Sequence, residues 1–297
     1  MNYRKIAVIA LLFVFICGCK TTQLSKVIQN EKEIALSASS SGNYAQAVIS
    51  WQAYFDHQSR ANQEISAEDY AKAANDAYRA ENTPLTVTWF DAARLSGYSG
   101  EDMHLALSEI FRKQNNLSRE LTSLVYLSEN YPETAAKKRT YPRLFEIYME
   151  TDKQKAYELW NNLEKSDQSK EPYMNNYFIL NKSFENLTVV DSLANELILL
   201  NPKHVAALEW NGEKYYWLGE NRYQREMEKY NKRKTNVQYQ FLLNELKIVA
   251  EDFKRSRDYF EKLWAMEKLP RYASFLSNIY ARLDNRERAE YYKKFAE

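Results

Sequence analysis

Apolar residues recur every three to four positions along most of the chain, and short polar breaks separate the runs. The stretch 101–134 shows this pattern best, because two apolar stripes flank a polar break at 114–116. The first stripe contains Leu105, Leu107, Ile110 and Phe111, and the second contains Leu117, Leu121, Leu124, Val125 and Leu127. This spacing places each set on one side of an α-helix, and Pro132 then stops the second helix. The stretch therefore predicts a helical hairpin.

A single hairpin of this size has too little partner surface to bury both of its apolar faces, whereas stacked copies can bury them. The spacing recurs and predicts further hairpins that start near Ala67, near Lys137, at Glu171, near Val205 and after Pro270. Between 220 and 235 the stripe fades into a charged stretch, which predicts an exposed helix end and a loop, and a longer helix follows over 241–250. The sequence therefore predicts an all-α repeat fold.

Segment 42–54 carries the most specific local pattern. Gly42 is followed by an aromatic residue at Tyr44, a small residue at Ala47 and a large aromatic at Trp51. This order resembles the second helix of a tetratricopeptide repeat (TPR), in which the small residue sits where two helices cross and the aromatic fills the groove toward the next repeat. The resemblance implies an all-α, right-handed superhelical solenoid of about seven to eight TPR-like hairpins over residues 30–297.

Later hairpins repeat this pattern in part. Small residues recur at the expected helix crossings, at Ala74, Ala93, Ala156 and Ala194. Large aromatics recur at one repeat position, where we expect core side chains, at Trp51, Phe90, Trp160 and Phe260. The pattern is incomplete in places, because Glu120 and Leu127 replace small residues and Pro142 falls inside a first helix.

The N-terminal residues 1–18 are typical of a secretory signal peptide. Arg4 and Lys5 precede the apolar run Ile6–Ile16, which is too short to span a bilayer comfortably. The segment 16–19, Ile-Cys-Gly-Cys, then resembles the lipobox of bacterial lipoproteins. The resemblance implies a lipoprotein signal peptide that is removed after residue 18, and a lipid on Cys19.

Such a lipid would make 19–29 a lipidated tether ahead of the repeat domain. The two or three acyl chains expected on a lipoprotein would hold the chain durably at a membrane, because each buried methylene adds about 0.8 kcal/mol. Lys20 stands where some inner-membrane lipoproteins carry Asp, which favours the outer membrane. The resemblance therefore implies a lipid-anchored protein of the bacterial cell envelope, and an ordinary signal peptide with a chance cysteine is the alternative.

Charge, histidine positions and motifs argue against several classes of function. The formal net charge of +1 at pH 7 gives no basic footprint for nucleic acid. The histidines His57, His104 and His204 are far apart, and none has a second His or Cys at helical spacing. The sequence contains no motif of a catalytic nucleophile, a phosphate loop or a zinc cluster. We therefore expect no enzyme, no metal and no cofactor beyond the covalent lipid, and we expect His104 to be a packing residue.

Aromatic residues are abundant, with 23 Tyr, 13 Phe and 6 Trp. Most should fill the core, but a minority fall where the first helix of each hairpin would face a concave surface, with Arg or Lys nearby. Exposed aromatics beside cations suit an extended peptide, because they combine apolar contact with carboxylate pairing. The expected groove residues are Tyr78, Arg79, Arg112, Lys113, Tyr141, Phe145, Tyr148, Lys182, Tyr216 and Trp217.

These observations predict a membrane-anchored scaffold or adaptor lipoprotein that binds another protein or peptide in the concave groove. The TPR resemblance implies work in an envelope assembly or secretion complex. The alternative is a glycan-binding lipoprotein in which Tyr216 and Trp217 stack on sugar rings, and it requires both rings to be exposed together as a flat platform. A component of a repeat-containing enzyme complex is a third possibility.

Overall fold

The computed structural model describes residues 26–296, which contain helices and turns and no β-strand within that range. The signal segment and Cys19 therefore lie outside the described residues. Residues 26–29, which the sequence reading assigned to the tether, already belong to the first helix. Within the described range the chain forms two compact units, which divide between Ile147 and Tyr148, inside one helix.

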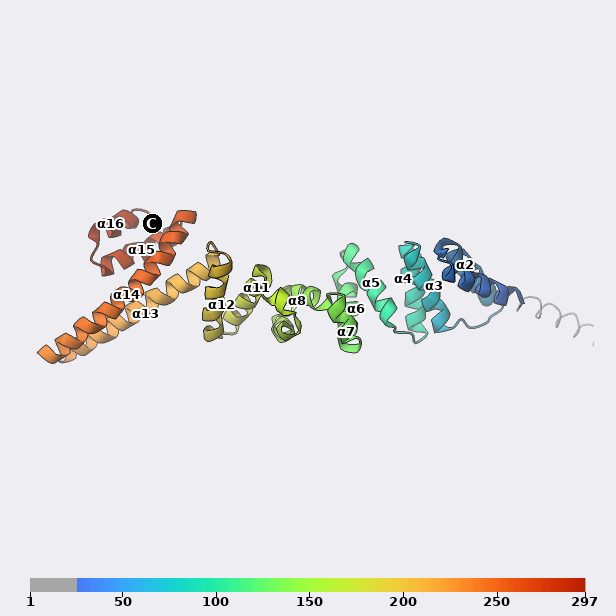
Figure 1. Cartoon of the computed structure of the whole chain (residues 1–297), viewed down its shortest axis with the longest axis horizontal. Helices are drawn as coiled ribbons and strands as arrows, with labels where there is room; N and C mark the ends of the chain where they lie inside the picture. The colour runs from blue at the N-terminus through green and yellow to red at the C-terminus, as the bar shows by residue number, and fades with distance from the viewer. Residues whose placement is uncertain (1–25, 297) are drawn as a thin grey trace, which may run out of the picture. The chain divides into compact units, whose positions relative to one another are not determined.

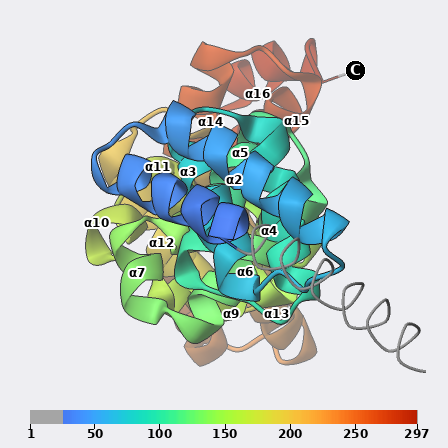
Figure 2. The same cartoon turned by 90° about the vertical axis from the view of Figure 1, so that its right-hand side faces the viewer.

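The first unit is a succession of helical hairpins (Figure 1). A helix over 26–40 pairs with α2 (Tyr44–Arg60), α3 (Ala67–Arg79) pairs with α4 (Thr83–Leu95), and α5 (Glu101–Lys113) pairs with α6 (Leu117–Asn130). The short helix α7 (Pro132–Lys137) and α8 (Thr140–Thr151) follow. The first hairpin, drawn in blue, faces the viewer in Figure 2.

The second unit begins within α8 and continues with α9 (Lys153–Leu159), the 3₁₀ turn η1 (Trp160–Asn162) and α10 (Lys165–Gln168). Three hairpins complete it: α11 (Glu171–Ser183) with α12 (Leu187–Leu200), α13 (Val205–Lys232) with α14 (Asn236–Met266), and α15 (Pro270–Arg282) with α16 (Arg286–Lys293). The all-α, helical-hairpin fold predicted from the sequence is confirmed.

The turns inside the hairpins share one design. The second residue after the first helix has a positive φ, at Gly42, Glu81, Asn115, Glu185 and Asp284. An asparagine follows each of them and donates its backbone N–H to the carbonyl five residues earlier, as in Asn43 to Ala38 and Asn116 to Phe111. Most of these asparagines also cap the next helix; the Asn116 side chain, for example, accepts from the Arg119 N–H at 3.3 Å. Each such turn thus ends one helix and begins the next within three residues.

The repeated small and aromatic positions form the core, as predicted. Ala47, Ala74, Ala93, Ala156 and Ala194 are fully buried. The aromatics Trp51, Phe90, Trp160 and Phe260 are buried as well. At the crossing of α13 and α14, a Cβ added to Gly212 would lie only 3.0 Å from the Phe260 ring, so the helices meet where a side chain is missing.

The charged stretch 220–235 is the end of α13, to Lys232, followed by the connection 233–235, as the sequence predicts. The predicted extent of the next helix is wrong, because α14 starts at Asn236 rather than at Phe241 and continues without a break to Met266. Ion pairs along the helix surface, such as Lys229 with Glu226 and Lys232 with Glu228, support this polar part of α13. The weak apolar stripe therefore marks the solvated end of a long helix.

Candidate functional site

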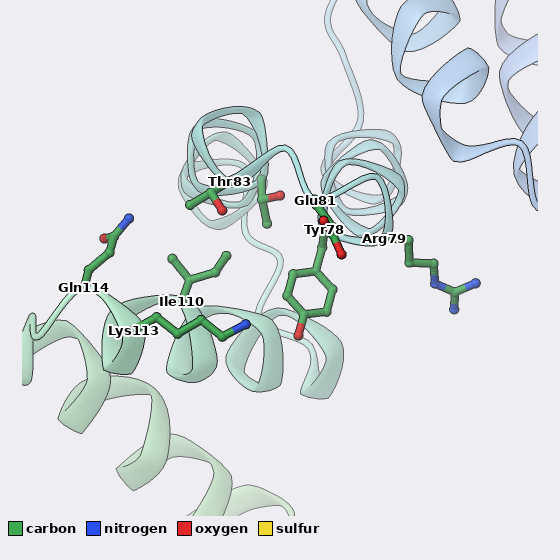
Figure 3. Close-up of a pocket in the computed structure, with 8 residues that line it drawn as sticks. Tyr78, Arg79, Glu81, Thr83, Ile110, Lys113 and Gln114 are labelled. Carbon is green, nitrogen blue, oxygen red and sulfur yellow. The ribbon is translucent and has the colours of Figure 1, made fainter.

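A groove in the first unit collects three of the predicted binding residues. It has a volume of about 560 Å³ and is lined by Tyr78, Arg79, Glu81, Thr83, Thr86, Ile110, Lys113 and Gln114. We call it the α3–α5 groove, because it lies between the α3–α4 turn and α5 (Figure 3). Ile110 supplies an apolar patch, and the other lining side chains are polar or charged. The groove is open and therefore suits a segment of chain more than an enclosed small molecule.

Tyr78 and Arg79, on neighbouring positions of α3, are both held by other helices. The Tyr78 hydroxyl donates to the Glu109 carboxylate of α5, and burial together with Glu109 raises the pKa of Tyr78 to about 12. Arg79 donates from Nη1 to the Tyr44 hydroxyl at 2.9 Å, and its guanidinium lies 5.2 Å from the centre of the Tyr44 ring. Figure 3 shows Arg79 extending away from Tyr78. The two side chains are therefore fixed before any ligand arrives.

Arg112 and Lys113 differ from these two, because both are exposed and have no hydrogen bond or ion pair from their side chains within residues 26–296. They occupy the last turn of α5, where a cation is favoured by the helix dipole. The helix dipole therefore offsets part of the cost of placing two adjacent cations there, and both charges remain available to a ligand. Lys113 lines the α3–α5 groove, whereas Arg112 points into a second cavity.

This second cavity, the α5–α6 pocket, has a volume of about 130 Å³ and is rich in cations. Its lining residues are Leu105, Ser108, Glu109, Arg112, Glu120, Leu124, Lys138, Arg139, Thr140 and Arg143. The carboxylate of Glu120 is already paired with Arg143 at 2.7 and 2.9 Å, and Glu109 is bonded to Tyr78. The cations of this pocket therefore outnumber its carboxylates, and both carboxylates are occupied.

The prediction that Tyr141, Phe145 and Tyr148 face a groove is wrong. All three are buried, and Phe145 is fully inaccessible. The predicted hairpin started near Lys137, but Arg139 has a positive φ of 57° and α8 starts at Thr140. Leu144 and Ile147 are buried beside the aromatic residues, so neighbouring elements cover the side of α8 that was expected to face a groove.

The remaining predicted residues belong to the second unit. Lys182 is exposed and its ammonium lies 5.5 Å from the centre of the Trp210 ring. Tyr216 is half-buried and packs edge-on against Phe253 and Phe275. Trp217 is 51% exposed, but its ring is turned by 87° from that of Tyr216. The two rings therefore do not form the flat platform that glycan stacking requires.

His104 is a packing residue, as predicted. It is buried, stacks on Tyr126 at 3.9 Å between ring centres and shares a hydrogen bond with the Ser99 hydroxyl at 3.0 Å. Burial lowers the pKa of His104 to about 4. Within residues 26–296, no group of three or more His, Cys, Asp or Glu is placed to hold a metal ion.

Sequence reasoning missed the buried carboxylates that join neighbouring helices. Asp76 accepts from the Trp51 indole at 2.8 Å and from the Ser39 hydroxyl at 2.6 Å, and Asp69 accepts from Lys32 at 2.6 Å. Glu120 did carry a signal, since it stands where the repeat pattern has a small residue. An acidic residue on an otherwise apolar helix face needs a buried partner.

No family model and no curated protein matches this sequence. Among solved structures, the chain is similar to MamA, with 14% identity, a TM-score of 0.39, and coverage of 66% of this chain and 89% of MamA. It is also similar to YrrB, described as a TPR protein with an unusual peptide-binding site, with 18% identity, a TM-score of 0.40 and coverage of 63% and 96%. A tetratricopeptide repeat protein from Parabacteroides merdae shows 13% identity, a TM-score of 0.37 and coverage of 91% and 92%.

Proposed function

We propose that the chain is a non-enzymatic scaffold that holds an acidic, extended segment of another protein across the end of α5 in the first unit. The observation that carries this proposal is the position of Arg112 and Lys113. They are neighbours in sequence, have no partners for their side chains in the described residues, and line two cavities on different sides of one helix. A segment that crosses the end of α5 would meet both cations.

The chemistry of the two cavities favours a peptide with carboxylates. Ile110 and the Tyr78 ring offer apolar contact in the α3–α5 groove, and free cations on both sides of α5 offer charge-assisted hydrogen bonds, each of which contributes about 1.5–3 kcal/mol. Tyr78 and Arg79 are already fixed by Glu109 and Tyr44, which reduces the entropy lost on binding. The second, glycan-binding candidate has no supporting observation, because Tyr216 and Trp217 are perpendicular.

The decisive experiment is affinity capture from membranes with the wild-type chain and with an Arg112→Glu/Lys113→Glu variant. We expect the variant to lose the main co-purifying protein by at least about tenfold, since two favourable charge contacts become repulsive. Lys293→Glu/Lys294→Glu is the matched control, because these adjacent cations are also exposed at the end of a helix, in the second unit. Equal capture by all three chains would refute the groove assignment.

We also propose that the scaffold is anchored at an envelope membrane, with the outer membrane favoured, through a lipid on Cys19. The support is the lipobox-like segment 16–19. In cells fed labelled fatty acid, the wild-type chain should carry label and Cys19→Ser should carry none. Label that persists on the Cys19→Ser chain would show that the anchor residue has been misassigned, while leaving the groove proposal unaffected.

A further inference from the structure

The free end of the α13–α14 hairpin has a chemistry unlike the rest of the second unit. This end, which we call the hairpin tip, comprises residues 229–244: the last turn of α13, the connection 233–235 and the first turns of α14. Figure 1 shows α13 and α14 lying side by side up to their connection. The apolar cluster that surrounds the pair includes Tyr223 and Val249 but no residue between them, so the tip extends beyond that core.

The tip carries cations and no carboxylate. Its basic residues are Lys229, Lys232, Arg233 and Lys234, whereas the sequence 229–244 contains neither Asp nor Glu. Lys229 and Lys232 pair with glutamates of the preceding turns of α13. Arg233 and Lys234 are exposed and have no ion pair with any residue in 26–296. An anionic partner would therefore find at least two uncompensated positive charges at the connection.

Exposed apolar side chains lie next to these charges. Val237 is 66% exposed, Phe241 is 61% exposed and Tyr239 is 45% exposed. Each residue turns an α-helix by about 100°, so Val237 and Phe241 lie on one side of α14 and Tyr239 lies on the opposite side. A partner helix would cover only one of these sides. A medium that surrounds the tip, such as the boundary between lipid headgroups and acyl chains, would contact both.

Contacts within the tip connect its two helix ends. The Thr235 hydroxyl caps α14 by accepting from the Gln238 N–H at 3.2 Å. The rings of Tyr230 and Tyr239 meet across the hairpin with their centres 5.9 Å apart. The apolar side chains are thus presented on helical backbone rather than on a loop, and a helix that is already formed lowers the entropy lost on binding.

We infer that the hairpin tip binds the surface of an anionic phospholipid bilayer, with Arg233 and Lys234 at the headgroups and Val237, Tyr239 and Phe241 at the acyl boundary. Basic residues beside aromatic and aliphatic ones are the combination that such surfaces attract. The inference depends neither on the α3–α5 groove nor on the Cys19 lipid. If the lipid is present, the tip would be a second membrane contact in the other unit.

The test is cosedimentation with vesicles of phosphatidylcholine alone or mixed with phosphatidylglycerol. The chain used begins at Lys20, which removes the apolar leader and the lipid site but keeps every described helix; circular dichroism checks its folding. We expect binding to the anionic vesicles that weakens with salt, and little binding to the neutral ones. Because each cation near such a surface contributes about fivefold in affinity, Arg233→Gln/Lys234→Gln should weaken binding about 30-fold.

Phe241→Ser should weaken the same binding about tenfold, since burial of most of a phenyl ring is lost. Leu199→Ser is its matched control, because Leu199 is 83% exposed in the same unit, and Lys268→Gln controls for loss of an exposed cation. No preference for anionic vesicles, or equal losses in the controls, would overturn the inference. So would equally tight binding to soluble polyglutamate without an effect of Phe241→Ser, which would assign the tip to an acidic protein.

Discussion

The ion pair between Glu120 of α6 and Arg143 of α8 allows a quantitative test of how the first unit is held together. The Glu120 side chain is 2% exposed, and both of its oxygens accept from Arg143, at 2.7 Å from Nε and 2.9 Å from Nη2. This pairing raises the pKa of Arg143. Replacing Arg143 with Met keeps much of the side-chain volume but leaves a buried carboxylate without its cation.

The expected loss of stability follows from that unpaired charge. Breaking a buried ion pair from one side costs about 3–5 kcal/mol. Arg143 is 27% exposed, so water can reach part of the vacated space; we therefore expect Arg143→Met to cost about 3 kcal/mol, the lower end of that range. Glu120→Leu should cost about 1 kcal/mol, because the partly exposed Arg143 keeps its contact with Glu146 at 3.3 Å. The double variant should lie within about 1 kcal/mol of wild type, which corresponds to a coupling energy of about 3–5 kcal/mol.

Urea unfolding of the wild-type chain, the two single variants and the double variant measures this cycle. Hydrogen exchange of α6 and α8 should be followed in parallel, because a chain with two units need not unfold in one step. The surface pair of Arg119 with Asp91 is the control: Nη2 of Arg119 donates to both carboxylate oxygens, at 2.8 and 2.9 Å, but both side chains are at least 31% exposed. Arg119→Met should cost less than about 1 kcal/mol. A double variant as unstable as Arg143→Met, or equal costs for Arg143→Met and Arg119→Met, would refute the reasoning.

Two further predictions concern the core. His104 has a pKa of about 4 in the folded chain and about 6.5 when unfolded, so the unfolded chain binds an extra proton between these values. The stability that depends on neutral His104 should be fully present above pH 6.5, and the free energy of unfolding should fall by about 2 kcal/mol between pH 7 and pH 5. Urea unfolding at both pH values measures this change. A His104→Phe variant that kept the full pH slope would contradict the prediction. At the α13–α14 crossing, Gly212→Val should destabilise the chain by about 1–3 kcal/mol through overpacking against Phe260. Thermal unfolding measures it, and an unchanged midpoint would show that the helices can separate without cost.

The sequence predicts the hairpins well where periodicity and turn chemistry agree. The starts at Ala67, Glu101, Glu171 and Val205 coincide with those of α3, α5, α11 and α13. Periodicity could not place α8, because Pro132 was taken as a stop, whereas proline is well suited to the first turn of a helix and here begins α7. The positive φ of Arg139 then delays the next helix.

The candidate site was predictable only in part. Arg112 and Lys113 were identified correctly as exposed, because cations in the last turn of a helix rarely find buried partners. Phe145 was wrongly predicted to face a groove and is buried. Periodicity tells which residues share a side of a helix but not which neighbouring element covers that side. Glu120 shows the same limit, because its partner Arg143 lies on another helix. A local sequence pattern does not indicate contacts between residues so far apart in the chain.

The turns explain why the helices of the α13–α14 hairpin are longer than those of the other hairpins. In five hairpins a positive-φ residue followed by asparagine ends one helix and starts the next, from Gly42-Asn43 to Asp284-Asn285. In α13 no such pair follows the first helical turns, and Gly219 permits close approach to Phe253 instead of ending the helix. The two helices therefore continue together until Thr235 caps α14. The extra turns bury few apolar residues, so Val237 and Phe241 stay exposed there and are available to a surface outside the chain.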